Sequence, residues 1–238
     1  MRSIIVDERI SEGCERALSR LGLFVMKLSP CSLLPSAIRS HPDSLIFKYG
    51  KRLFTYASYA EEGLSLFSDV REYHGDHTLT FLSDEPSDKY PEDCKLNALV
   101  INNMLFAREK SLCAGIKTAA ERDGLKIINT KQGYPACSTL KIGESHAITA
   151  DKGLARTLSE EGISTLLISE GGITLPPYEY GFIGGASFVY SGTVYFFGEI
   201  DRHADARRIR EFIEKAGYKI KSLTDEPLAD LGGAILLD

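Results

Sequence analysis

A cysteine and a histidine stand out as residues able to do covalent chemistry. Cys137 follows the sequence Gly133-Tyr134-Pro135-Ala136 and directly precedes a predicted strand, so we expect it at the centre of the fold rather than in an outer helix. A catalytic thiol must lose its proton to a nearby base or be stabilised by a cation. His41 lies in the sequence Ser40-His41-Pro42-Asp43, where it could take that proton while Asp43 orients its ring. Cys137, His41 and Asp43 are therefore our candidate catalytic residues.

The other cysteines and histidines fit structural positions. Cys14 and Cys113 lie within helical patterns and are predicted core residues, whereas Cys94 is a second thiol outside such a pattern. Five cysteines with no paired spacing indicate free thiols in a reducing compartment. No CxxC or HExxH motif is present, so no metal site is predicted. The remaining histidines are expected at the surface: His74, His77, His146 and His203.

Two short acidic segments echo each other along the chain: Ser83-Asp84-Glu85-Pro86 and Thr224-Asp225-Glu226-Pro227. Paired carboxylates hold a planar guanidinium group well, through two-pronged, charge-assisted hydrogen bonds. The candidate ligand-binding residues here are Asp84, Glu85, Asp225 and Glu226. Serine or threonine with aspartate before proline also forms a turn that ends a strand, and this structural alternative remains open.

The composition restricts the partners. Among 238 residues, 28 are Lys or Arg and 33 are Asp or Glu, so the formal net charge is −5. An acidic chain is a poor partner for nucleic acid or an anionic membrane surface. The first apolar segment is short and runs into Asp7 and Glu8, unlike a secretory signal, and no stretch approaches the roughly 18 apolar residues of a membrane helix. The sequence predicts a cytoplasmic protein and leaves protein partners open.

The elements that must position these residues repeat along the chain. Five glycines each end a predicted helix and open a strand: Gly22, Gly75, Gly124, Gly162 and Gly217. Glycine in the left-handed conformation is a typical helix C-terminal signal. The sequence also predicts antiparallel hairpins that precede the helices, with tight turns at residues 49–50, 102–103, 143–144 and 191–192. Four units are therefore complete.

The two chain ends supply the missing fifth hairpin. The strands Ala234–Leu237 and Ile4–Val6 both lack a partner, and pairing them removes two strand edges that would otherwise promote aggregation. The sequence thus predicts one α/β domain, residues 1–238, built as a five-bladed propeller of strand–strand–helix–strand units. Two doubly wound domains are the alternative, but they need single strands between helices rather than hairpins.

This ring resembles the pentein fold, the fold of guanidino-group-modifying enzymes. The resemblance rests on the repeated junctions and strands Leu96–Ile101, Cys137–Leu140, Gly184–Phe188 and Gly232–Leu236, and it covers the whole chain in architecture. Within the fold, the chain is most similar to an uncharacterised bacterial family. Its enzymes include arginine and agmatine deiminases, dimethylargininases and amidinotransferases, which act on guanidinium groups through a cysteine thiolate, a histidine and acidic residues. Another branch, the ribosome anti-association factor, only binds, so the fold alone does not decide activity.

The resemblance implies that the segments joining the units line the central axis. These segments carry many more acidic than basic residues, and such a field attracts a small guanidine-like or amine-like cation. Tyr180 belongs to a loop rich in Gly, Pro and Tyr that could form an aromatic wall for a flat cation. Gly184 and Gly185 would let the backbone approach the axis closely. Together with Asn97 they complete the candidate ligand-binding residues.

The sequence departs from the enzymes of this fold at one point. They place the histidine in a middle unit and the thiol at the start of the last unit, whereas this chain has Cys137 in the middle and Asp230-Leu231-Gly232-Gly233 late. Two functions therefore remain open. The favoured one is binding of a small cation or a partner without the usual catalytic residues. The other is a cysteine-dependent hydrolase or transferase acting on a guanidine or amidine C–N bond, with Cys137 as nucleophile. No cofactor is predicted for either.

Overall fold

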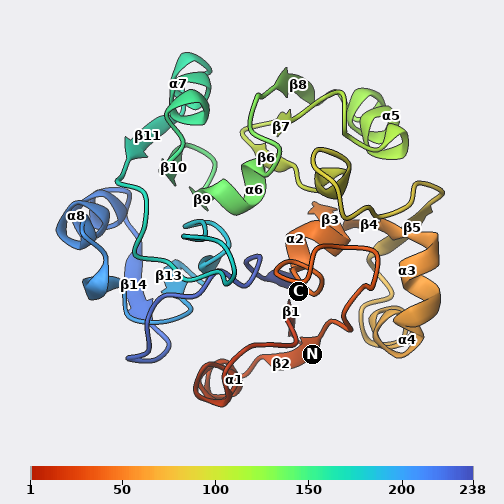
Figure 1. Ribbon diagram of the computed structural model, residues 1–238, viewed down its shortest axis with the longest axis horizontal. Helices are drawn as coiled ribbons and strands as arrows, with labels where there is room; N and C mark the ends of the chain where they lie inside the picture. The colour runs from red at the N-terminus through yellow and green to blue at the C-terminus, as the bar shows by residue number, and fades with distance from the viewer. Residues whose placement is uncertain (1, 238) are drawn as a thin grey trace.

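The computed structural model describes residues 2–237 and arranges them as a ring of five units around a central axis (Figure 1). Each unit holds one three-stranded sheet, in which an antiparallel hairpin is followed by a third strand parallel to the second. The helices that connect the second and third strands lie at the rim of the ring (Figure 1). The predicted five-bladed α/β ring is confirmed.

Four of the units follow one another along the chain. Their hairpins are β3 (Ile46–Tyr49) with β4 (Arg52–Tyr56), β6 (Leu99–Ile101) with β7 (Met104–Ala107), β9 (Thr139–Ile142) with β10 (His146–Thr149), and β12 (Ser187–Tyr190) with β13 (Thr193–Phe196). Their third strands are β5 (Thr78–Leu82), β8 (Lys126–Asn129), β11 (Ser164–Leu167) and β14 (Lys219–Ser222). Asn102 and Asn103 turn the second hairpin with φ of 49° and 58°, a conformation that asparagine tolerates better than most residues.

The rim helices of these units are α3 (Ala57–Glu62) with α4 (Leu64–Tyr73), α5 (Ala114–Arg122), α7 (Lys152–Glu160) and α8 (Ala206–Lys215). Short 3₁₀ turns lie at η1 (Glu92–Cys94) and η2 (Ile200–Arg202). The predicted left-handed glycine follows four of the five helix patterns, but Gly75 does not adopt it. There the helix ends differently, because the backbone N–H of His77 donates to the carbonyl of His74 and turns the chain by itself.

The fifth unit is closed by the two ends of the chain. β15 (Ile235–Leu237) pairs antiparallel with β1 (Ser3–Val6), with Ser3 opposite Leu237, and β1 pairs in parallel with β2 (Phe24–Lys27). The helix α1 (Glu12–Arg20) connects β1 to β2. The predicted pairing of the terminal strands is therefore confirmed, and it makes the ring continuous.

Packing fixes the five sheets around the centre of the ring, which we call the hub. The middle strands β1, β7 and β13 are buried along their whole length. Helix residues such as Leu18 of α1 and Ile209 of α8 are fully buried against the sheets. None of the helices within residues 2–237 is both long and apolar enough to cross a lipid bilayer.

Two one-turn helices carry the chain into the hub. The helix α2 (Pro42–Leu45) leads directly into β3, and α6 (Pro135–Ser138) leads directly into β9. Each begins with proline at its first position, where the missing N–H costs no hydrogen bond and the fixed φ suits a helix. These two turns set the direction of the side chains at the start of β3 and β9.

Candidate active site

Residues from three units meet at the hub. His41 precedes α2 and Asp43 lies within it, Cys137 lies in α6, and Asp230 lies just before β15. One ligand atom from each of His41, Cys137 and Asp230 falls within 4.8 Å of the others, and all three residues are buried. The structure therefore brings together the three residues that the sequence singled out for chemistry, and adds an aspartate.

Backbone hydrogen bonds fix the added aspartate. The carboxylate oxygens of Asp230 accept from the backbone N–H of Phe182 at 2.8 Å and of Gly232 at 3.0 Å. The thiol of Cys137 lies 3.3 and 3.4 Å from the same two oxygens. A carboxylate with this many donors cannot rotate freely, so the sulfur and the carboxylate stay in contact.

Glycines make room for that contact. A Cβ atom on Gly185 would lie 1.8 Å from Oδ1 of Asp230 and 2.7 Å from the sulfur of Cys137. A Cβ on Gly184 would lie 2.4 Å from the carbonyl oxygen of Ala136. These two candidate residues therefore line the hub through their backbone, which packs against the cluster more closely than any side chain would allow.

His41 is only 1% exposed and lies between three carboxylates. Its Nδ1 is 3.9 Å from oxygens of both Asp43 and Asp230, and its Nε2 is 3.8 Å from Asp7. None of these distances is a hydrogen bond, and neither ring nitrogen has a hydrogen-bond partner among the described residues. Arg9 holds Asp7 in place through a 2.6 Å ion pair.

The charges at the hub shift the protonation of its members. Burial raises the pKa of Asp43 to about 6, and Asp230 adds to this while His41 opposes it. Burial, followed by the nearby carboxylates of Asp230 and Asp43, raises the pKa of the Cys137 thiol well above its ordinary value. Without a ligand, the thiol is therefore neutral and a poor nucleophile.

A cavity of about 390 Å³ opens directly onto this cluster. Aromatic side chains form its walls, with Tyr134 lying between Tyr90 and Phe182 at ring-centre distances of 6.1 and 6.5 Å. Four carboxyl side chains reach it, and the described residues that line it include no lysine or arginine. These carboxyl groups belong to Asp43, Asp93, Glu179 and Asp230.

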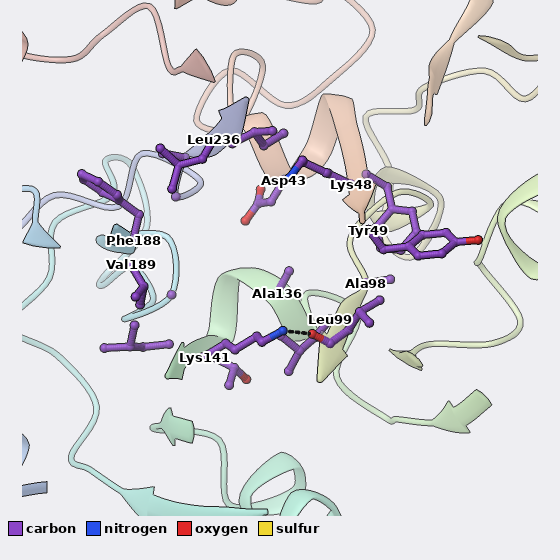
Figure 2. A pocket seen from close by; sticks show the side chains of 18 of the residues that line it. Asp43, Lys48, Tyr49, Ala98, Leu99, Ala136, Lys141, Phe188, Val189 and Leu236 are labelled. Atoms are coloured by element: carbon purple, nitrogen blue, oxygen red, sulfur yellow. Dashed lines mark hydrogen bonds between the residues drawn. The ribbon is translucent and has the colours of Figure 1, made fainter. Parts of the chain in front are cut away.

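A larger cavity of about 730 Å³ lies along the hub and also reaches Asp43. Figure 2 shows Asp43 and Lys48 among the side chains that line this cavity. Lys141 is engaged there, since its Nζ donates to the carbonyl of Val100 at 2.9 Å and to Glu144 at 2.6 Å. Asp43 thus lines both cavities.

Asn97 and Tyr180 occupy different places relative to the cluster. The side-chain oxygen of Asn97 accepts from the backbone N–H of Ala136 at 2.9 Å and of Cys137 at 3.4 Å. Asn97 therefore holds the first turn of α6 and positions the thiol from behind. Tyr180 lines the smaller cavity, on the loop that the sequence indicated as an aromatic wall.

The four acidic residues of the echoing segments do not reach either cavity. Glu85 is exposed and accepts a hydrogen bond from Ser58 at 2.6 Å, while Asp84 is half-buried. Glu226 accepts from Ser11 at 2.7 Å, which ties β14's following loop to the start of α1, and Asp225 is exposed. The structure places these segments at the ends of strands, as the turn alternative described.

Two expectations on histidine and cysteine have clear outcomes. All five cysteines, which lie within the described residues, are buried and none forms a disulfide, as expected. The surface placement of the other histidines is wrong for three of them, because His74, His77 and His203 are at most 8% exposed. His74 illustrates the reason, since its Nε2 lies 2.8 Å from the hydroxyl of Ser3 and the ring fills a polar niche between two units.

Asp93, Glu179 and Asp230 belong to the acidic junction segments that were expected to line the axis, but they were not among the predicted site residues, and Asp7 was not predicted at the hub at all. Asp230 had a usable signal, because it precedes Gly232-Gly233 at the late junction, where the resemblance implied a functional residue. Asp7 had no such sequence signal, because an acidic residue directly after a strand is common. Only the ring closure brings Asp7 behind His41.

The five-unit ring defines the class of the fold: the chain has the pentein fold. Structures similar to it include a dimethylarginine dimethylaminohydrolase captured as an adduct with S-methyl-L-thiocitrulline, with a TM-score of 0.58 and 11% identity over 94% of this chain and 92% of that one. Inosamine-phosphate amidinotransferase of Streptomyces griseus has a TM-score of 0.58 and 13% identity, over 97% of this chain and 82% of that one. Agmatine deiminase of C. jejuni has a TM-score of 0.55 and 9% identity, over 93% of this chain and 87% of that one.

Within this class, the chain belongs to a family of unknown function, DUF6873, whose model matches residues 5–235. No curated protein matches the sequence. The likeness to the solved structures shows the fold, so the activity must be argued from the hub itself.

Proposed function

We propose that the protein binds a small organic cation with a planar amidinium or guanidinium group in the smaller cavity. The observation that carries this proposal is the charge of the lining. Four residues with carboxyl side chains line a partly enclosed space, and the described lining residues include no lysine or arginine to balance them. A ligand cation supplies the missing charge.

The shape and lining of the cavity support a flat ligand. Its volume of about 390 Å³ lies within the range of small-molecule sites. Tyr134 and its aromatic neighbours offer ring faces, which attract cations. At the floor, Asp43 and Asp230 offer acceptors for the N–H groups of a planar cation, the interaction that favours amidinium and guanidinium over a simple amine.

Calorimetric titration with benzamidine tests this proposal, with neutral benzamide as the control of equal shape. We expect benzamidine to bind and benzamide not to bind. The variant Asp230→Asn should weaken benzamidine binding roughly 10- to 100-fold, the value of a lost charge-assisted hydrogen bond. Asp225→Asn, at an exposed position away from the cavity, should bind like the wild type. Equal binding of both compounds, or no effect of Asp230→Asn, would contradict the proposal.

A second function is favoured by the position of one atom. The sulfur of Cys137 lies at the floor, in contact with Asp230, where it would meet the central carbon of a bound cation. A bound cation also offsets the two carboxylates that keep the thiol protonated. The enzymes of similar fold are named for arginine derivatives and agmatine, so guanidino compounds are the natural substrates to test.

The covalent reaction would take two balanced steps. The sulfur attacks the amidino carbon, a C–S bond forms, and the thiol proton passes through Asp230 or His41 to the departing nitrogen as the C–N bond breaks. Water then attacks the same carbon, the C–S bond breaks, and the thiol regains a proton. The net change is hydrolysis of one C–N bond, which releases ammonia or an amine.

Ammonia or amine release from agmatine, arginine and dimethylarginine measures this reaction, and mass spectrometry detects the adduct on Cys137. Cys137→Ser should abolish both signals. Cys14→Ser is the matched control, because Cys14 is also buried but packs near Thr224 in another part of the ring. Absence of release and of adduct with every compound would leave binding as the function.

A further inference from the structure

Three potential metal ligands, from His41, Cys137 and Asp230, lie within 4.8 Å of one another at the hub, and Asp43 adds a fourth next to His41. They are Nδ1 of His41, Oδ1 of Asp43, a carboxylate oxygen of Asp230 and Sγ of Cys137. The measured separations are 3.9 Å from Nδ1 to each carboxylate and 3.3 Å from the sulfur to Asp230. The donors come from three units, so no sequence spacing connects them.

These separations match those of a tetrahedral metal site. With metal–nitrogen, metal–oxygen and metal–sulfur bonds of about 2.0–2.3 Å, tetrahedral ligand atoms lie about 3.3–3.7 Å apart. The separations of the His41 Nδ1 from the two carboxylates and of the sulfur from Asp230 differ from these by only a few tenths of an ångström. An adjustment of that size lies within the reach of side-chain rotation and would leave the backbone in place.

The unsatisfied histidine is independent evidence for a missing partner. His41 is 1% exposed, and neither ring nitrogen has a hydrogen bond within the described part of the chain. A buried polar atom without a partner is costly, so such a group indicates an absent ligand. Its Nδ1 lies 3.9 Å from both Asp43 and Asp230, while its Nε2 lies 3.8 Å from Asp7.

The position of Asp7 has a precedent in the general design of metal sites. A histidine that binds a metal through one nitrogen usually directs the other N–H to a carboxylate, which fixes the ring. Asp7 is fully buried and is itself held by Arg9 and by the hydroxyl of Ser40 at 2.8 Å. A small rotation of the His41 ring would complete that second contact.

We propose that His41, Asp43, Cys137 and Asp230 bind a divalent transition metal ion, with zinc as the ion that this mixture of nitrogen, oxygen and sulfur donors suits best. Cys137 binds as the thiolate, and its proton leaves to solvent. The metal and the organic cation would use the same two carboxylates. Each should therefore exclude the other, and a metal-loaded hub would not bind an amidine.

Cobalt(II) tests the site directly, because a cobalt–thiolate bond gives a near-ultraviolet charge-transfer band. Metal-free full-length protein is titrated with cobalt and, separately, with zinc against a chromophoric chelator. We expect one equivalent of either metal to bind and the band to appear with cobalt. Cys137→Ser should abolish the band, and His41→Gln should weaken zinc binding at least 10-fold. Cys14→Ser and His146→Gln, which alter the same residue types away from the hub, should change neither measurement.

Absence of the band in the wild type, or its persistence in Cys137→Ser, would overturn the metal site. Because the wild-type titration alone can give the first result, the test does not depend on the variants folding. Benzamidine binding to the metal-free protein separates this proposal from the previous one. Benzamidine binding without zinc binding refutes only the metal site, whereas zinc binding without benzamidine binding refutes only the organic ligand. Where both bind, zinc should displace benzamidine, and independent binding would contradict a shared site.

Discussion

The substitution Gly185→Ala tests the geometry on which the whole hub depends. Gly185 does not have a left-handed backbone, so alanine introduces no backbone strain there. The added methyl group would instead lie 1.8 Å from Oδ1 of Asp230, 2.5 Å from its Cγ and 2.7 Å from the sulfur of Cys137. All three distances are far below van der Waals contact, so the carboxylate or the backbone must move.

The cost can be estimated from what must move. Overpacking of a buried site costs about 1–3 kcal/mol. Displacing Asp230 also loses at least one of its hydrogen bonds from Phe182 and Gly232, and each charge-assisted bond contributes about 1.5–3 kcal/mol. We therefore expect Gly185→Ala to lower the free energy of unfolding by about 3–5 kcal/mol. In a chain of this length that is a fall in Tm of roughly 6–20 °C.

Chemical denaturation and thermal unfolding measure this loss. Gly153→Ala is the matched control, because Gly153 lies in α7 and the nearest atom that its added Cβ would meet is Oδ1 of Asp151, at 3.3 Å. It should be neutral or stabilising, since alanine favours a helix over glycine by up to about 1 kcal/mol. Removing the obstructing carboxylate should relieve the clash, so Gly185→Ala with Asp230→Ala should lose less than the sum of the single changes. If Gly185→Ala unfolds within 1 kcal/mol of the wild type (about the lower limit of overpacking costs), Asp230 does not lie where the structure places it.

Three further outcomes follow from the same residues. Asn97→Ala should destabilise the protein by about 1–3 kcal/mol and weaken benzamidine binding, because the N–H groups of Ala136 and Cys137 lose their buried acceptor. The control Asn103→Ala, at an exposed turn, should leave benzamidine binding unchanged. Unaltered benzamidine binding in Asn97→Ala would contradict the positioning role of Asn97. In metal-free protein, Asp43 has a pKa of about 6 in the folded state and an ordinary value in the unfolded state. Between about pH 4 and 6 the unfolded chain has therefore lost this proton while the folded chain still holds it. The free energy of unfolding should fall as pH rises through this window, by at most about 3 kcal/mol. Urea denaturation across this window should show a smaller fall in Asp43→Asn than in the wild type, and identical slopes would refute the raised pKa. Iodoacetamide should label Cys137 slowly near neutral pH because burial and two carboxylates raise the pKa of its thiol, and rapid labelling of the unliganded protein would contradict that environment.

The architecture could be predicted from the sequence because it is written in local signals. Hairpin turns at Asn102-Asn103 and Ser191-Gly192 and left-handed glycines such as Gly124 each depend on a few neighbouring residues. The closure of β15 onto β1 followed from a count of unpaired strands. Repetition of the unit five times strengthened these signals, since each unit had to agree with the others.

The chemistry of the hub was less predictable, because it depends on contacts between distant residues. Cys137 and His41 could be found as reactive residue types at junctions, but their partner Asp230 is 93 residues from Cys137 and is set by backbone N–H groups. The echoing acids near residues 84 and 225 had suitable chemistry, and yet they lie at strand ends outside both cavities. A repeated acidic motif shows that two positions are equivalent in the fold, not that they face the axis.

The buried charged and polar groups at the hub lower the stability of the folded protein, and a ligand would offset this cost. Asp43 and Asp230 both lie 3.9 Å from Nδ1 of His41, and the charge of Asp230 helps to raise the pKa of Asp43. Like charges in such a poorly hydrated place destabilise a folded protein unless a cation is present. His41 adds a second unmet demand, because its buried nitrogens lack hydrogen bonds among the described residues. One bound cation, whether organic or metallic, would reduce the repulsion between the carboxylates and give the His41 ring a partner. Within residues 2–237 the hub therefore lacks a balancing charge, although the middle strands of the five sheets around it are largely buried.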